Sequence, residues 1–435
     1  MRKPFFTREF YTELPRPLFV RRQTVAILHF GGDLSNIRTD REHTTMSQHV
    51  IISGGGPAGL LTALGLAQAG TRVTVLEQLE ELNDSPRALV YHHPVLPHLE
   101  RLGILDECVS AGFIRQGFAW RIHSSQEMIR WSMSCLDGTT AHPYSLHLHQ
   151  GLLSRIVARH LELLPNAKIL RSTKCVGCTE HADGVVVEVE SPAGLEAIDG
   201  HFLIGADGAG SAVRRDILKL SFFGMTWPMR YVATNTRVEL GSDGFEDTTM
   251  QLDDDYGAVF CRIDGTPLWR ITFMEDPELP ESGIPERIVK KFVNHIPDLE
   301  YEVDNFAPYR MHQRVSDKMR VGRVLLVGDA AHVTNPTGGL GLTGGMFDAF
   351  ALTEALNRVV HDGANHDVLE YYERDRRRIF TELVSPRASD NLRRLYYLQP
   401  GQQKDDCIQW FKKVAEDKDL MRREFSFTEQ METRF

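Results

Sequence analysis

Three short segments of the chain have the residue types and spacing of a nucleotide-binding site. They read GGGPAG at residues 54–59, GADG at 205–208 and GDAAH at 328–332. Glycines between a strand and a helix let the backbone approach a phosphate, and the start of the helix offers unpaired N–H groups to it. Together the segments predict a pocket for one long nucleotide with two phosphates.

The first segment requires a strand before it and a helix after it, and the sequence supplies both. The apolar residues 50–52 precede the glycines, and an apolar helical stretch follows them. In that setting Gly54 permits a tight turn, Gly56 admits the pyrophosphate and Gly59 lets the helix pack closely on the strand. Ala58 belongs to the same small-residue turn.

An acidic residue closes the next predicted strand. Residues 72–76 are expected to form a second parallel strand, and Glu77 follows them at the expected offset of about 20 residues from the glycines. Glu77 can accept hydrogen bonds from ribose hydroxyls. The glycines at 339–344 have the same spacing but follow no strand directly, so a glycine-rich turn is the simpler interpretation of that pattern alone.

The composition is that of a globular enzyme. The chain has 435 residues, of which 42% are hydrophobic and 25% charged, values typical of folded proteins. The net charge of −10 and the lack of a block rich in lysine and arginine argue against nucleic acid or an anionic membrane as partner. No apolar stretch is long enough to span a membrane. Six scattered cysteines without a secretory signal indicate free thiols and a cytoplasmic location.

Two short patterns resemble metal-binding sites but favour none. Cys175 and Cys178 have the spacing of half a zinc site, yet they lead into an alternating strand pair in which cysteine acts as a small apolar residue. His147 and His149 share one face of a possible strand, without an identifiable third ligand. We therefore expect no metal site.

The elements that position these segments follow an α/β pattern with an insertion. Residues 47–215 alternate strands and helices, 216–320 are rich in strands, and 321–397 return to the α/β pattern and end in helices. We expect residues 1–46 to lie outside the fold and 398–435 to form a charged helical tail with a solvated face. The predicted fold class is α/β, a doubly wound nucleotide-binding domain with an inserted β-sheet domain and C-terminal helices.

These motifs resemble those of the FAD-dependent aromatic hydroxylases, the single-component flavoprotein monooxygenases of the para-hydroxybenzoate hydroxylase type. The likeness covers about residues 47–397: the second segment, with Ser211 and Arg214 after it, is similar to the family's DG segment, and the third, through Asp348, to its GD segment. The resemblance implies a Rossmann-like FAD-binding domain, a substrate domain in the inserted sheet, bound FAD, and NADH or NADPH that binds transiently.

The resemblance also assigns roles to single residues. It places Asp329 beside the hydroxyls of FAD, and Arg87 and Gln150 at its phosphates and ribityl chain. It gives Asp207 a part in FAD placement and nicotinamide access. A helix that starts in the glycine loop would direct its N–H groups and dipole at the flavin; the loop and helix residues concerned are Gly339, Gly341, Leu342 and Thr343.

The implied reaction is the hydroxylation of an aromatic small molecule, phenolic or similar. NAD(P)H would reduce FAD, O₂ would form a flavin C4a-hydroperoxide, and its distal oxygen would pass to the ring. Candidates for the substrate pocket, none with an assigned catalytic role, are Trp227, Tyr231, Tyr256, Arg270 and His312. Two alternatives stay open: a flavin-dependent halogenase or epoxidase, and a non-catalytic escort protein with the same fold.

Overall fold

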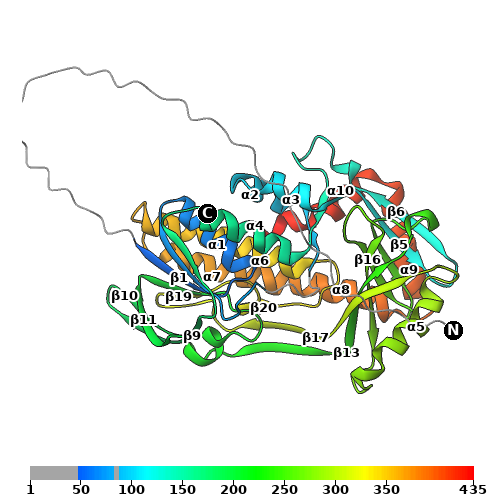
Figure 1. Ribbon diagram of the computed structural model, residues 1–435. Helices are drawn as coiled ribbons and strands as arrows, with labels where there is room; N and C mark the ends of the chain where they lie inside the picture. The colour runs from blue at the N-terminus through cyan, green and yellow to red at the C-terminus, as the bar shows by residue number, and fades with distance from the viewer. Residues whose placement is uncertain (1–47, 83–87) are drawn as a thin grey trace, which may run out of the picture. The chain divides into compact units, whose positions relative to one another are not determined.

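The computed structural model describes residues 48–82 and 88–435 (Figure 1). The expectation for residues 1–46 and the role implied for Arg87 lie outside these residues. Among the described residues, no helix has the length and apolar character needed to cross a membrane.

A six-stranded sheet carries all three motifs. Its order is β18 (Arg320–Val321), β19 (Val324–Leu326), β12 (Phe202–Gly205), β1 (His49–Ser53), β2 (Arg72–Leu76) and β8 (Ala167–Leu170). All neighbours are parallel except β18 and β19. Val50, Ile51 and Ile52 are fully buried because the sheet is covered on both faces. The predicted α/β fold is confirmed.

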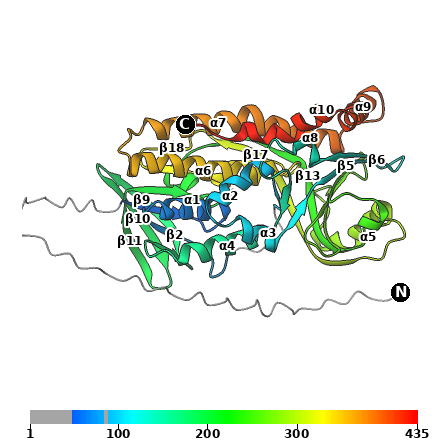
Figure 2. The same cartoon turned by 90° about the horizontal axis from the view of Figure 1, so that it is seen from above.

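Helices and a small sheet cover the two faces of this six-stranded sheet. α1 (Pro57–Gln68) lies between α4 (Gln150–Glu162) and α6 (Leu340–Val360) on one face, with α7 (Asp367–Ile379) packed on α6 (Figure 2). One side of α4 is apolar at the helical period and is buried; it consists of Leu153, Ile156, Val157 and Leu161.

On the other face lies an antiparallel sheet of β9 (Lys174–His181), β10 (Gly184–Ser191) and β11 (Gly194–Gly200). Its alternating valines, such as Val185 and Val187, join the core. Cys175 is buried in the same way, and all six cysteines are free thiols. Both Cys175 and Cys178 thus lie in the strand pair that the sequence predicts.

A second, eight-stranded sheet forms the other half of the described chain. Its order is β20 (His332–Val333), β17 (Glu302–Ser316), β13 (Phe222–Arg237), β16 (Leu268–Glu275), β15 (Ala258–Arg262), β14 (Thr248–Leu252), β5 (Gly117–Ile122) and β6 (Glu127–Ser132). The predicted insertion supplies most of it. β5 and β6 come from the preceding α/β segment, with β5 paired in parallel to β14, and β20 comes from the segment after residue 320 and pairs with β17. The sheet therefore extends beyond the boundary expected at residue 215.

Helices lie on both faces of the eight-stranded sheet. α5 (Ile284–His295) packs on one face, and α8 (Ser385–Tyr396), α9 (Gln402–Glu416) and α10 (Lys418–Phe425) lie toward the other (Figures 1 and 2). The tail was expected to be one solvated helix. Instead it forms two helices, and Phe411 and Val414 of α9 are fully buried.

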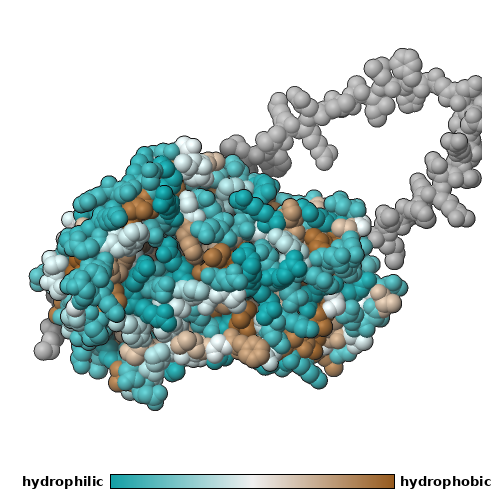
Figure 3. Space-filling model, turned by 180° about the vertical axis from the view of Figure 1, so that it is seen from behind, coloured by the Kyte–Doolittle hydropathy of each residue, from teal (hydrophilic) through white to brown (hydrophobic). Residues whose placement is uncertain are grey.

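A three-stranded sheet lies near the junction of the two halves. It pairs β7 (Ser145–His147) with β3 (Val90–Tyr91) and β4 (Phe113–Arg115), and α2 (Leu96–Arg101) and α3 (Leu105–Ala111) connect these strands. On the face seen in Figure 3, hydrophobic groups form small separate patches within a mostly hydrophilic surface.

Candidate functional site

A cavity of about 800 Å³ brings the three sequence motifs together. Its lining comes from the glycine-containing segments, one face of the eight-stranded sheet, and the C-terminal helices. Of the predicted cofactor residues, seven line it: Gly56, Ala58, Gln150, Asp329, Gly339, Gly341 and Leu342. Five do not: Gly54, Gly59, Glu77, Asp207 and Thr343. Four of these five are within two residues of one that lines the cavity, and Glu77 hydrogen-bonds to Gly55, the neighbour of Gly56.

The first motif leaves space where a pyrophosphate would lie. Gly54 has a φ of +116°, and a Cβ there would come within 2.3 Å of the Ala206 carbonyl oxygen. A Cβ on Gly59 would lie 2.2 Å from the Gly54 oxygen. A Cβ on Gly56 would meet no atom within 4 Å, although Gly56 caps α1 and lines the cavity. The backbone here is packed tightly on the protein side and open on the cavity side.

Two of the predicted acids hold the loops around the cavity. Glu77 is buried and accepts the N–H groups of Gly55 at 2.8 Å and Leu79 at 2.9 Å. Asp207 accepts the Ser211 hydroxyl at 2.5 Å and the Val213 N–H at 3.1 Å. Each carboxylate therefore fixes a turn through both oxygens, and further hydrogen bonds would have to use their remaining lone pairs.

A buried arginine joins the second motif to the third. Arg214 donates to the carbonyl of Ala209 at 2.8 Å and to that of Ala330 at 2.7 Å. Asp329, between buried neighbours, is itself exposed and lines the cavity. The strand ends that carry the two motifs are thereby held at one place.

A buried charge cluster supports the third motif from behind. Asp348 of α6 lies 2.6 Å from Arg376 and 2.7 Å from His332, and it accepts the N–H of Gly328 at 3.0 Å. Burial alone would raise the pKa of Asp348, but the charges of His332 and Arg376 outweigh it and hold this pKa at about 2. Asp348 is therefore ionised at neutral pH, and it anchors the loop that presents Asp329.

The start of α6 forms another part of the cavity wall. Gly338 and Gly339 both have positive φ, and α6 begins at Leu340, so its first N–H groups lie along the cavity. His92, which also lines the cavity, contacts the Gly338 carbonyl through Nε2 at 2.9 Å. The hydroxyl of Thr343 donates to the Gly339 carbonyl, one helical turn earlier, at 3.1 Å. The Thr343 side chain is thus bonded to its own helix and does not line the cavity.

Burial and the charge of Arg115 lower the pKa of His92 to about 4. The ring is therefore neutral at neutral pH and donates Nε2–H to Gly338. This bond fixes the tautomer of His92 and holds the glycine loop in place.

Three of the five candidates for the substrate pocket line the cavity, namely Tyr231, Arg270 and His312. The Tyr231 hydroxyl lies 2.9 Å from that of Thr337, and His312 Nδ1 lies 2.9 Å from the Thr226 hydroxyl. Arg270 donates through Nε and Nη2 to Asn235 Oδ1, at 3.1 and 3.0 Å.

The other two candidates lie elsewhere. Tyr256 packs against His123 and His295, with Lys291 over its ring. Trp227 is buried and donates to Gln313 Oε1 at 3.1 Å. Neither side chain lines the cavity.

The alternation of the strands explains which residues reach the cavity. Trp269 and Ile271 of β16 belong to the apolar cluster under α5, whereas Arg270 and Thr272 face the opposite side and line the cavity. Aromatic side chains extend this floor on β5 and β6; they are Phe118, Trp120 and Trp131. Sequence reasoning missed them, and it also missed His92 and Arg115, because no local motif marks them.

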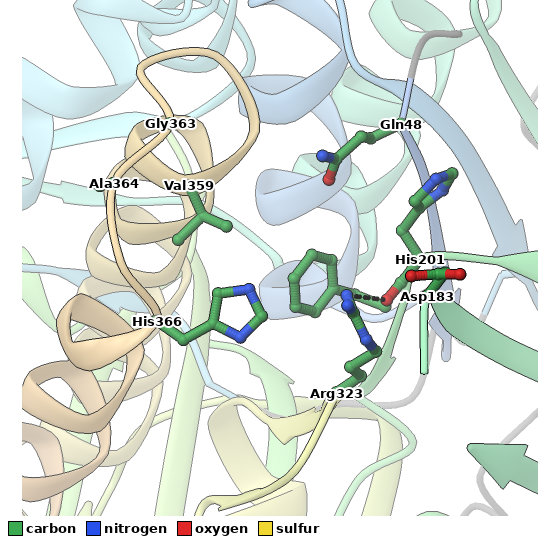
Figure 4. Close-up of a pocket in the computed structure, with 9 residues that line it drawn as sticks. Gln48, Asp183, His201, Arg323, Val359, Gly363, Ala364 and His366 are labelled. Atoms are coloured by element: carbon green, nitrogen blue, oxygen red, sulfur yellow. Dashed lines mark hydrogen bonds between the residues drawn. The ribbon is translucent and has the colours of Figure 1, made fainter. Parts of the chain in front are cut away.

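A second cavity, of about 360 Å³, carries none of these features (Figure 4). His201, Asp183 and Arg323 line it, and Arg323 donates to the His201 carbonyl at 3.4 Å. No residue of the three motifs lines it. The larger cavity is therefore the candidate site.

Known proteins are similar to this chain in sequence. The sequence matches the family model described as "FAD binding domain" over residues 47–386. It is 59% identical over 392 residues to 6-hydroxy-3-succinoylpyridine 3-monooxygenase of Pseudomonas putida (strain DSM 28022 / S16), covering 89% of this chain and 99% of that protein. It is 38% identical over 379 residues to para-nitrophenol 4-monooxygenase of Pseudomonas sp. (strain WBC-3), covering 86% and 93%.

Solved structures are similar as well. The crystal structure of p-nitrophenol 4-monooxygenase from Pseudomonas putida DLL-E4 superimposes with a TM-score of 0.85 at 37% identity, covering 89% of this chain and 99% of that one. A ternary complex of aklavinone-11 hydroxylase with FAD and aklavinone gives a TM-score of 0.71 at 26% identity, with 82% and 70% covered.

Proposed function

Because the chain belongs to the family of FAD-dependent aromatic hydroxylases, we propose that it hydroxylates a hydroxypyridine that carries a carboxylate side chain. The chain is an FAD-dependent monooxygenase, with NADH or NADPH as reductant and O₂ as co-substrate. The names of its relatives favour hydroxylation over the halogenase, epoxidase and escort alternatives. What the proposal adds to the family's activity is the identity of the substrate ring and of its side chain.

The residues of the large cavity fit FAD. The space beside Gly56 admits a pyrophosphate, and the N–H groups at the start of α1 would bind it. Asp329 and Gln150 line the cavity and would hold the sugar and ribityl hydroxyls. The start of α6 would face the flavin ring and stabilise negative charge there. When bound, FAD supplies the redox chemistry that activates O₂.

The chain's own residues position the loops and walls of the cavity and exclude water from it. His92 holds the glycine loop at Gly338, and the pair of Tyr231 and Thr337 ties the sheet floor to the same loop. The aromatic floor and the C-terminal residues Phe425 and Phe427 enclose the cavity with apolar groups. A flat ring between these walls would react away from bulk water.

The observation that carries the substrate proposal is the lining of this cavity. Aromatic walls suit a planar ring, and the buried Arg270 places positive charge beside them. A ring that bears a carboxylate satisfies both features. The name of the relative with 59% identity, a monooxygenase of 6-hydroxy-3-succinoylpyridine, describes such a molecule.

The proposal is tested with the purified holoenzyme. We expect 6-hydroxy-3-succinoylpyridine to stimulate NAD(P)H oxidation, with an oxygenated product detected by mass spectrometry. Para-nitrophenol serves as the comparison, because the relative with 38% identity carries its name. A kcat/KM for para-nitrophenol above that for the succinoylpyridine would overturn the proposal and favour a nitrophenol monooxygenase.

Replacing Gly56 with alanine tests the pyrophosphate site. The new Cβ meets no protein atom within 4 Å, so the melting temperature of the apoprotein is expected to stay unchanged. The methyl group occupies the space for the pyrophosphate, so the Kd for FAD is expected to rise at least about tenfold, or about 1.4 kcal/mol. Fluorescence titration of apoprotein with FAD measures it.

Gly54→Ala is the contrasting variant. Its φ of +116° and the approach of 2.3 Å to the Ala206 oxygen strain the backbone itself, so the apoprotein is expected to lose about 1–3 kcal/mol of stability. Gly241→Ala, with open space around its Cβ, is the control for both variants. An unchanged FAD affinity in Gly56→Ala would remove the role given to Gly56.

A further inference from the structure

Arg115 is a buried charge that the protein satisfies only in part. It ends β4, is 3% exposed, and lines the large cavity. Its Nη2 donates to the Ser145 hydroxyl at 3.0 Å and contacts the Met133 sulfur at 3.3 Å. Its Nε is buried and has no hydrogen-bond partner among the described residues. A buried donor without a partner costs free energy, which a ligand in the cavity would recover.

No carboxylate of the described residues lies within 4.0 Å of this guanidinium. Asp247, which acts on it electrostatically, is instead 4.0 Å from Arg262. Burial lowers the pKa of Arg115 to about 10, so it stays charged at neutral pH. A buried cation without a close counter-ion is expensive to maintain, and this indicates a counter-ion that enters with a ligand.

The groups around Arg115 do not neutralise it. Burial, and after it the charge of Arg115, lowers the pKa of His92 to about 4 and that of His147 to about 3. Both histidines are therefore uncharged at neutral pH. Arg270, a second cation, lines the same cavity. The two guanidiniums make this part of the cavity electropositive.

Aromatic rings stand next to this charge. The guanidinium carbon of Arg115 lies 5.9 Å from the centre of the Phe118 ring. Phe118 and Trp120 both line the cavity and pack edge to face. A ring held by these side chains would place a short acidic substituent within the range of Arg115.

We propose that Arg115 binds the carboxylate of the substrate's side chain and thereby selects acidic aromatic substrates. This inference rests on the proposed function and adds to it the residue that determines specificity. Arginine suits the task because its planar fork of donors matches a carboxylate.

The test compares two ligands that differ only in the group at the end of the side chain. They are 6-hydroxy-3-succinoylpyridine and 6-hydroxy-3-butanoylpyridine, in which a methyl group replaces the carboxylate. Titration calorimetry on the oxidised holoenzyme gives the Kd of each. We expect the wild type to bind the acid about 10- to 100-fold more tightly, the range of a charge-assisted hydrogen bond, and Arg115→Met to bind both alike.

Two further variants separate charge from packing. Arg115→Lys keeps the charge and is expected to retain part of the preference for the acid. Arg121→Met also removes a buried guanidinium, one that pairs with Gln251 and Gln126 and does not line the cavity; it is expected to keep the full preference. With saturating reductant, Arg115→Met should raise the KM of the acid far more than it lowers kcat.

An undiminished preference for the acid in Arg115→Met would overturn the inference. If that variant does not fold, the wild type decides the question, since equal affinity for the acid and its methyl analogue would also overturn it. A failure of the proposed function has a different signature, because the wild type would then turn over para-nitrophenol with a higher kcat/KM than the succinoylpyridine.

Discussion

Replacing Asp348 with alanine is expected to lower the free energy of unfolding by about 3–5 kcal/mol. Asp348 is fully buried and pairs with both Arg376 and His332. Without it, Arg376 would remain buried with its carboxylate partner gone, although its contacts to backbone oxygens such as that of Gly344 persist. The large effect thus comes from leaving the charge of Arg376 buried without a carboxylate, rather than from the loss of the ion pair itself.

Urea unfolding of the apoprotein measures this loss. Asp390→Ala is the control, because Asp390 forms an exposed pair with Arg393 and is expected to change stability by less than about 0.5 kcal/mol. Asp348 also holds the Gly328 N–H, so the alanine variant should release FAD more readily. A loss below about 1 kcal/mol would contradict the role assigned to the cluster.

The same carboxylate makes a defined contribution to pH dependence. The folded-state pKa of Asp348, about 2, is below its ordinary value of 3.8. The stabilisation is therefore complete above about pH 4 and is lost as the pH falls from there toward 2. Stability measured between pH 5 and pH 2.5 should fall less steeply in Asp348→Ala than in the wild type.

The sequence predicts the nucleotide-binding half of the fold well, because its signals are local. The run from Val50 to Ile52 and the glycines after it specify a strand, a turn and a helix within twenty residues. The four apolar positions on one side of α4 also follow a local pattern, the helical period, and are buried. Each of these predictions depends on neighbours along the chain.

The substrate end of the cavity depends on contacts between distant segments. Arg115 faces the cavity because β4 pairs with β7, 30 residues later. Arg270 faces it because of the register of β16 with β13, which places Asn235 opposite. A shift of one residue would turn either side chain to the other face. Residue types alone therefore indicate Tyr231, Arg270 and His312, which line the cavity, and equally Tyr256 and Trp227, which do not.

The C-terminal tail shows the same limit. Its charged residues favour a solvated helix, and the few apolar positions carry little weight in a sequence pattern. In the structure, Phe411 of α9 stacks on Trp120 with ring centres 4.0 Å apart, and the Trp131 indole donates to the Phe411 carbonyl at 3.1 Å. Trp120 and Trp131 both line the cavity, so the tail supports the substrate floor from behind.

Phe411→Ala is therefore expected to reduce both stability and substrate binding. The side chain is fully buried, so its truncation should cost about 3–5 kcal/mol in urea unfolding. Because Trp120 loses its stacking partner, the Kd of the aromatic substrate should rise while that of FAD, which binds against other elements, stays near the wild-type value. Gln409→Ala, exposed on the same helix, is the control and should change neither quantity. If the tail were only a solvated helix, Phe411→Ala would behave like this control.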